Sequence, residues 1–155
     1  MGFDKDELKV LALGASMIDV GMVNVPEHIL QKPGALTENE RKLVQSHVKS
    51  CLRLVDESGR IDHRVIEIIA CLHVRHNGQG YPKGLAGSDI PLTARMVGIA
   101  DTYDAMITER PYRQARSSFE AIQELTDLKG SLFHPDLTEA FTQAIGIFPT
   151  GSIVE

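Results

Sequence analysis

The chain has 155 residues, of which 43% are hydrophobic and 24% are charged, as is ordinary for a soluble globular protein. This composition excludes a disordered, collagen-like or low-complexity chain, and the length favours one domain. Asp and Glu outnumber Lys and Arg by 21 to 16, so the formal net charge is −5. We expect no nucleic-acid partner, because affinity for a phosphate backbone needs a clustered basic surface.

No apolar run approaches the ~18 residues that a membrane span needs. The N-terminus is acidic and lacks the basic segment of a secretory signal. We therefore expect a cytoplasmic protein with no membrane partner. Cys51 and Cys71 are too few for a disulfide framework and lie in apolar stretches, which predicts two buried, reduced thiols.

Apolar residues recur at helical spacing, and the alternating pattern of strands is missing, so the sequence predicts a single all-α domain. Capping boxes, in which a hydroxyl and a carboxylate three residues apart bond each other's backbone amides, mark helix starts at Thr37 and Ser117. Asp62 is the expected cap of a further helix. Helices are expected at 5–18, 37–55, 62–73 and 93–108, from Ser117 onward, and at 135–145.

The helical pattern stops in residues 76–92, which contain four glycines and two prolines. Loops of this length in compact domains are usually functional or disordered. Within the loop, Gly80, Tyr81 and Pro82 combine permissive and rigid residues, which favours a defined loop shape. We expect this loop to carry function.

Four residues with metal-binding side chains are expected on the inward faces of four different helices: Asp19, His47, His73 and Asp101. Two imidazoles and two carboxylates suit a divalent first-row metal such as iron, manganese or zinc. Taken singly, each histidine is more simply a core residue, and Asp19 is an acceptor at a helix end. The other four histidines (His28, His63, His76 and His134) are interpreted as surface residues.

The sequence gives little support for a nucleotide-binding loop or a cysteine nucleophile. The chain has no P-loop motif, and the glycines at 78 and 80 lack the third glycine and the preceding strand of a dinucleotide site. Apolar surroundings would raise the pKa of both cysteines and make them poor nucleophiles. Arg110 and Arg113 form either a solvated turn or a guanidinium clamp for phosphate.

Longer motifs resemble the HD-GYP family. Residues 77–87 (NGQGYPKGLAG) and 90–95 (IPLTAR) look like its GYP signature, and the likeness continues through 100–106 (ADTYDAM) and 110–113 (RPYR). Upstream, Val25-Pro26 and the segment 32–37 also fit. The resemblance covers essentially the whole chain.

The resemblance implies an all-helical HD-domain bundle with a long Gly/Pro-rich GYP loop. It implies two or three metals, often iron or manganese, and hydrolysis of cyclic di-GMP to pGpG or GMP by a metal-bridging hydroxide. Asp19 matches the Asp of the HD pair, His47 and His73 match two histidine ligands, and Asp101 matches the last carboxylate ligand.

The resemblance also implies roles outside the metal centre. Arg110 and Arg113 match basic positions that contact the nucleotide phosphates. The loop that contains Gly80, Tyr81 and Pro82 matches a surface that the family uses for partner contacts, including GGDEF-type domains.

The departures from the family pattern concern ligands. Ile18 stands where the family has the His of its HD pair, and Leu72 replaces the first of its two adjacent histidines. We expect residues 1–155 to be one HD-GYP-like domain that lacks the family's N-terminal ligand-bearing helix. Asp19 and Asp101 would then be vestigial catalytic residues, and at most one iron or manganese ion is expected, too few for a two-metal mechanism.

We therefore expect a bacterial signal-transduction domain that is catalytically impaired and acts by binding cyclic di-GMP, or a GGDEF-type or other signalling protein. The alternative is an active metal-dependent cyclic di-GMP phosphodiesterase that gives pGpG or GMP. A mononuclear metal protein that acts on another phosphate ester, and a structural dimerisation domain, rank lower. Apolar surface left by a missing helix predicts a homo-oligomer or a part of a longer chain.

Overall fold

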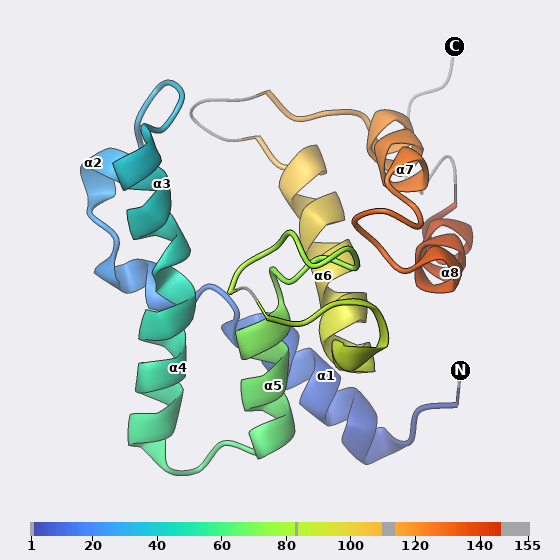
Figure 1. Ribbon diagram of the computed structural model, residues 1–155, viewed down its shortest axis with the longest axis horizontal. Coiled ribbons are helices and arrows are strands. Elements are labelled where there is room, and N and C mark those ends of the chain that lie inside the picture. Colours follow the sequence, from blue (N-terminus) through green and yellow to red (C-terminus); the bar gives the residue numbers. More distant parts are fainter. Residues whose placement is uncertain (1, 83, 110–113, 147–155) are drawn as a thin grey trace.

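The computed structural model describes residues 2–82, 84–109 and 114–146. Within these ranges the chain forms helices and loops and no β-strand, so the all-α prediction is confirmed. Figure 1 shows α6 near the centre, with α1 and α5 beside it, α3 and α4 stacked at one side, and α7 and α8 at the other. The helices are α1 (Lys5–Met17), the 3-10 helix η1 (Val20–Asn24), α2 (Glu27–Leu30), α3 (Glu38–Gln45), α4 (His47–Ser58), α5 (His63–Cys71), the 3-10 helix η2 (Gly87–Asp89), α6 (Leu92–Ile107), α7 (Ser118–Asp127) and α8 (Pro135–Ile145).

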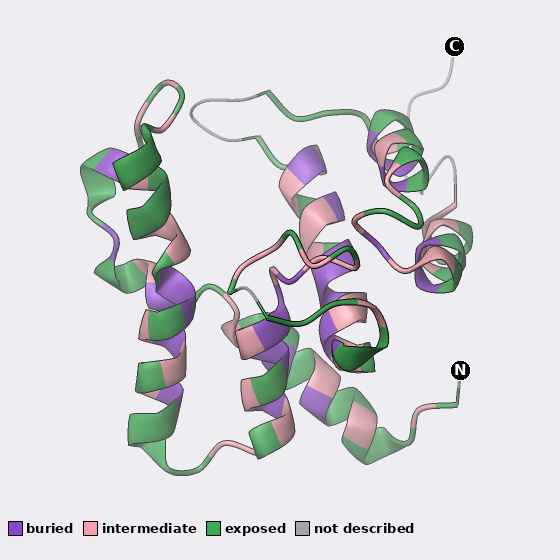
Figure 2. Ribbon diagram, viewed as in Figure 1, coloured by how far each residue is buried: buried purple, intermediate pink, exposed green. Residues whose placement is uncertain are grey.

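Helix α6 joins the two main parts of the apolar core. Through Val97 it belongs to a cluster with α1, α4 and α5, and through Ile99 and Tyr103 it belongs to a second cluster with α7 and α8. Figure 2 shows the buried residues of α4, α5 and α6 along their facing sides. Burial of each aliphatic side chain contributes about 1.5–3 kcal/mol to the stability of the fold. The two clusters therefore fix the positions of the helix ends, where polar residues gather.

The helix starts that were predicted from capping residues are confirmed. The side chains of Thr37 and Ser117 each accept a bond from the backbone amide three residues on, and the partner glutamates bond back. Asp62 accepts from the Arg64 amide at the start of α5, and Pro135 occupies the first turn of α8. Side-chain caps at three of these helix starts, and the fixed backbone angle of Pro135 at the fourth, were sufficient to predict the four boundaries.

The single helix expected at 37–55 is wrong, because the chain breaks at Ser46 into α3 and α4. The Ser46 hydroxyl donates to the Leu43 carbonyl at 2.6 Å. The ring of His47 reaches back so that Nδ1 lies 2.7 Å from the Val44 carbonyl oxygen. Side chains that bond nearby backbone carbonyls compete with a regular helix, and the break makes His47 the first residue of α4.

The C-terminal end of α5 is crowded by the backbone of two other segments. A Cβ atom on Gly80 would overlap the His73 carbonyl and lie 2.6 Å from the Arg75 amide nitrogen. A Cβ atom on Gly98 of α6 would lie 2.8 Å from the Leu72 carbonyl oxygen. The amide of Tyr81 donates to the His73 carbonyl at 3.1 Å. The glycines therefore allow the loop and α6 to lie directly against the residues that follow α5.

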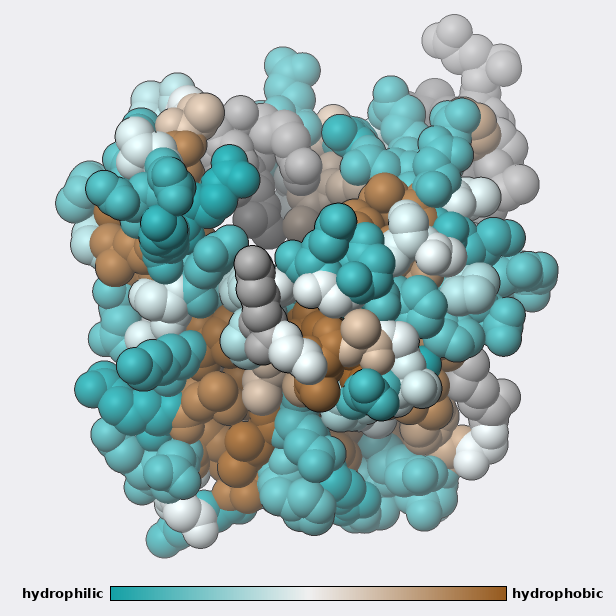
Figure 3. Space-filling model, in the orientation of Figure 1, coloured by the Kyte–Doolittle hydropathy of each residue, from teal (hydrophilic) through white to brown (hydrophobic). Residues whose placement is uncertain are grey.

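The surface is mixed, with apolar side chains between polar ones. Figure 3 shows the most extended apolar area of the visible face over the region of α4 and α5. An open groove runs between α1, α6 and α8. It is lined by apolar residues such as Leu8, Ala15 and Phe141, so this face of α1 is not covered by another helix. In the described parts of the chain, no helix has the length and hydropathy to cross a membrane.

Gly80 provides a direct test of this crowding. Gly80→Ala is expected to lower the free energy of unfolding by about 1–3 kcal/mol, because the added methyl group meets the backbone of residues 73–75, which follow α5. Chemical denaturation measures the change. Gly34→Ala is the matched control, since nothing lies within 4 Å of a Cβ atom there. Equal stability of the two variants would contradict the close approach.

Candidate functional site

Two of the residues predicted from the sequence meet at the end of α5. His47 lies at the start of α4 and is 1% exposed, and His73 lies in the turn after α5. Their Nε2 atoms are 3.3 Å apart, and the rings meet edge to face with centroids 5.2 Å apart. The two imidazoles therefore form a direct pair, which is the centre of the candidate site.

The hydrogen bonds of the pair assign its protons. The Val44 carbonyl can only accept, so Nδ1 of His47 carries a hydrogen, and its Nε2 is free to accept from Nε2 of His73. Burial above all, together with the neighbouring His47 and Arg75, lowers the pKa of His73 to about 3. The ring of His73 is thus neutral, and it shares one hydrogen bond with the ring of His47.

Tyr81 covers this pair from the GYP loop. Its ring stacks on His73 with centroids 4.6 Å apart and an interplanar angle of 25°. Burial raises the pKa of Tyr81 to about 12, Arg75 opposes this shift, and Asp101 and Asp19 add to it. Gly80 is half-buried and Pro82 is exposed. Of the three residues predicted to form a partner surface, Tyr81 therefore turns its ring toward the histidines.

The two predicted carboxylates lie on the neighbouring pocket. Asp19 precedes η1 and Asp101 lies on α6, and both line an open pocket of about 340 Å³ between α1 and α6. Ile18 and Asp104 line the same pocket. Carboxylates line this pocket, whereas the two imidazoles meet beside it at the end of α5, so the predicted ligands occupy two adjoining environments.

The donor set fits a metal ion only in part. Two imidazoles whose Nε2 atoms face each other, one with its Nδ1 held by a backbone carbonyl, are arranged as metal-binding histidines commonly are. However, the described residues bring together no group of three or more His, Cys, Asp or Glu side chains that could hold a metal ion. A stable first-row site needs at least three such ligands, so we derive no step that runs through a metal.

The aliphatic residues at the substituted ligand positions have structural roles. Leu72 is 1% exposed and belongs to the core cluster of α1, α4 and α5. Ile18 is half-buried and packs against the same cluster. Both positions therefore contribute packing, and neither contributes a polar group to the site.

The structure also tests the other residues singled out in the sequence. Arg110 and Arg113 lie outside the described residues. Cys51 and Cys71 are buried free thiols, as predicted, and burial raises the pKa of each. His28 and His63 are exposed, as predicted.

The surface interpretation of His76 and His134 holds only in part, since both residues are partly exposed but one ring nitrogen of each is buried. Each borders a loop or a helix end and was therefore expected at the surface. However, the His76 amide donates to the Leu132 carbonyl and the two rings meet edge to face, so tertiary contacts cover part of each ring.

Arg75 is a residue of the site that the sequence did not single out. Its guanidinium group lies 5.2 Å from the centroid of the Phe133 ring. Burial lowers its pKa, and the charges of Asp101 and Tyr81 oppose that shift. Its position two residues after His73, in the segment leading to the GYP loop, was the available signal. Arg75 supplies a positive charge close to His73 and Tyr81.

The low pKa of His73 has a consequence for stability. In an unfolded chain the ring binds a proton below its ordinary pKa of 6.5, whereas the folded ring does so only near 3. The unfolded state therefore binds more protons in this window, and the free energy of unfolding should fall as the pH falls, by up to about 1.4 kcal/mol per pH unit.

Denaturation of chelator-treated protein between pH 6.5 and 5 measures this loss. His73→Gln should show a smaller loss over the same interval, because glutamine does not titrate. His28→Gln, at an exposed position, should behave as the unsubstituted protein. An unchanged pH dependence in His73→Gln would contradict the buried neutral ring.

Comparisons with known proteins agree with this architecture. The profile of the HD domain family matches residues 1–137. A cyclic di-GMP phosphodiesterase of Pseudomonas aeruginosa is 37% identical over 92% of this chain, which spans 34% of that protein. A cyclic di-GMP phosphodiesterase response regulator of Xanthomonas campestris is 34% identical over 98% of this chain, which spans 42% of that protein. The chain thus spans about a third to two fifths of these relatives.

A solved structure is similar in fold. An HD-GYP protein of Bdellovibrio bacteriovorus superposes with a TM-score of 0.74 at 24% identity, over 92% of this chain and 45% of that one. The helical arrangement and the family match lead to one conclusion: this chain has the fold of an HD-GYP protein and belongs to the HD domain family.

Proposed function

We propose that this chain is a signalling domain of a cyclic di-GMP pathway whose hydrolytic activity is impaired, and that it acts by binding cyclic di-GMP or a signalling protein. The relatives are named as cyclic di-GMP phosphodiesterases, which supports the ligand class. One observation carries the impairment: the position of the family's missing histidine at Leu72 is filled by a fully buried core residue.

The energetics of the site support this proposal. A buried imidazole without a partner would destabilise the core, whereas Leu72 and Ile18 stabilise it by burying apolar surface. The remaining histidines bond each other through their Nε2 atoms. A phosphodiesterase of the two-metal type must polarise the phosphate and activate a water molecule, and two paired imidazoles beside an acidic pocket supply neither function alone.

The alternative is an active metal-dependent cyclic di-GMP phosphodiesterase that gives pGpG or GMP. Two observations favour it. The relatives bear that name, and the acidic pocket that contains Asp19 and Asp101 adjoins the histidine pair. In that case, further ligands would have to come from outside the described residues.

Hydrolysis assays distinguish the two proposals. With cyclic di-GMP and added manganese or ferrous iron, we expect product formation at least about a hundredfold slower than that of the Pseudomonas relative measured beside it. Chromatography of pGpG and GMP gives the rate. A rate comparable to that of the relative would overturn the proposed impairment and support the phosphodiesterase.

Metal content gives an independent readout. We expect at most one iron or manganese per chain by elemental analysis of protein purified without oxygen. Ile18→His places an imidazole beside Asp19 at the acidic pocket and should raise the content, while Leu13→His adds the same group at an exposed position of α1 and should not. Two or more metals in the unsubstituted protein would contradict the partial site.

Self-association is a further part of this proposal. Val23 is 77% exposed and Val20 is 44% exposed on η1, and clustered exposed apolar side chains favour a partner surface. We expect light scattering to give a mass of at least twice the 17.0 kDa of one chain. A monodisperse monomer at high protein concentration would contradict a homo-oligomer.

A further inference from the structure

Three nitrogen atoms outside the histidine pair share one unusual property. Nδ1 of His76, Nδ1 of His134 and Nε of Arg95 are each buried and make no hydrogen bond within the described chain. Buried polar atoms without a partner are rare in native proteins, and each calls for an explanation. Here all three belong to residues that line the same pocket.

The three side chains come from three different elements. His76 opens the GYP loop, Arg95 lies on α6, and His134 is the residue before α8. The amide of His76 donates to the Leu132 carbonyl at 2.9 Å, which fixes the loop against the segment before α8. The rings of His76 and His134 meet edge to face with centroids 5.4 Å apart. Tertiary packing therefore holds the cluster, which no single helix could form.

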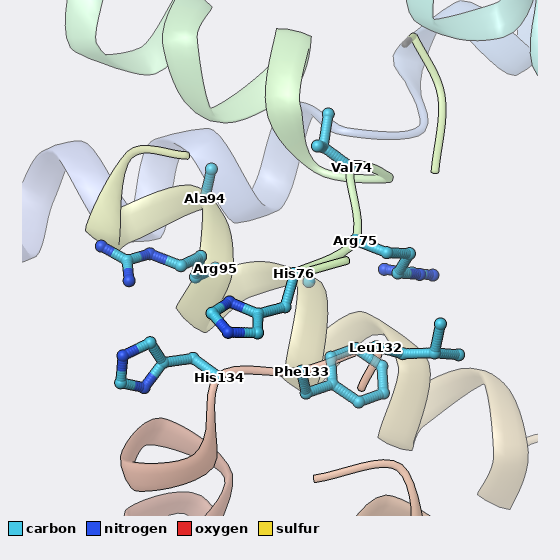
Figure 4. A pocket seen from close by; sticks show the side chains of 9 residues that line it. Val74, Arg75, His76, Ala94, Arg95, Leu132, Phe133 and His134 are labelled. Carbon is cyan, nitrogen blue, oxygen red and sulfur yellow. The ribbon is translucent and has the colours of Figure 1, made fainter. Parts of the chain in front are cut away.

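Figure 4 shows the arrangement. The side chains of His76, Arg95 and His134 extend to the same side of the pocket, while Arg75 points the other way, toward Phe133 and Leu132. No Asp or Glu lines this pocket, and His134 does not cap α8 with its side chain. The pocket is thus rich in hydrogen-bond donors and lacks an anionic partner.

The chemistry of the three nitrogens selects the ligand. Arginine is always protonated, so Nε of Arg95 can only donate. Each imidazole carries a hydrogen on Nδ1 in one neutral tautomer and in the charged form. The guanidinium charge of Arg95 opposes a metal cation at this place. A ligand that accepts several hydrogen bonds and carries negative charge satisfies all three groups at once.

The size of the pocket limits what enters. The pocket is only partly enclosed, and its volume of about 10 Å³ has room for about one oxygen-sized group. The three nitrogen atoms are buried, whereas the residues that carry them are partly exposed. We propose that this cluster is a second, separate binding site that takes one oxygen of a phosphate group, either free phosphate or a phosphate monoester.

The proposal is tested by nuclear magnetic resonance of the histidine ring nitrogens in the isotope-labelled chain of residues 1–155. Titration with inorganic phosphate should shift the resonances of His76 and His134 saturably, and leave those of the exposed His28 and His63 in place. GMP should act as phosphate does if monoesters enter the site, whereas guanosine should have no effect. Sodium chloride at equal ionic strength controls for screening.

The decisive variant is His134→Asp. A carboxylate there can accept from Arg95 and cap α8, so the melting temperature should be unchanged or higher. Phosphate affinity should nevertheless fall by at least about tenfold, because an anion already occupies the site. His28→Asp makes the same change in charge at an exposed position and should retain the affinity of the unsubstituted protein.

Three outcomes would overturn the proposal. The first is an absence of saturable shifts with phosphate, which would leave a bound water molecule as the partner of the three nitrogens. The second is saturable binding that is equal in His134→Asp and the unsubstituted protein. The third is a zinc titration that saturably perturbs both rings, which would make the cluster a metal site.

Discussion

The close approach of backbone at the C-terminal end of α5 is the constraint on which the site depends. Gly80 brings the GYP loop against His73 and Arg75, and Gly98 brings α6 against Leu72. Larger residues would push these segments apart, because backbone atoms cannot move aside as a flexible side chain can. This crowding sets His73 opposite His47 and fixes the position of Tyr81 above it.

The same short segment serves the core and the candidate site, and consecutive residues divide the two tasks. Leu72 faces the apolar cluster of α1, α4 and α5, while His73 faces His47. A histidine at Leu72 would face the protein interior without the carboxylate or carbonyl that buried imidazoles require. The choice of leucine there stabilises the fold and at the same time limits the chemistry available to the pair.

His73 and His76 are three residues apart, but they belong to two pairs of histidines that differ in their hydrogen-bond partners. His47 and His73 bond each other and a backbone carbonyl, and burial lowers the pKa of His73. His76 and His134 lie beside Arg95 with ring nitrogens that have no partner in the described chain. The first pair is complete as a structural element, whereas the second is complete only with a ligand or a water molecule.

The sequence by itself determined the helix starts at Thr37, Asp62, Ser117 and Pro135, because capping depends on residues within one turn. It also determined the family, since long motifs in the GYP loop are local. The break at Ser46, the inward position of Tyr81 and the burial of Nδ1 in His76 and His134 depend on tertiary packing. These features arise where segments far apart in the chain compete for the same space and the same hydrogen bonds, which local propensity does not report.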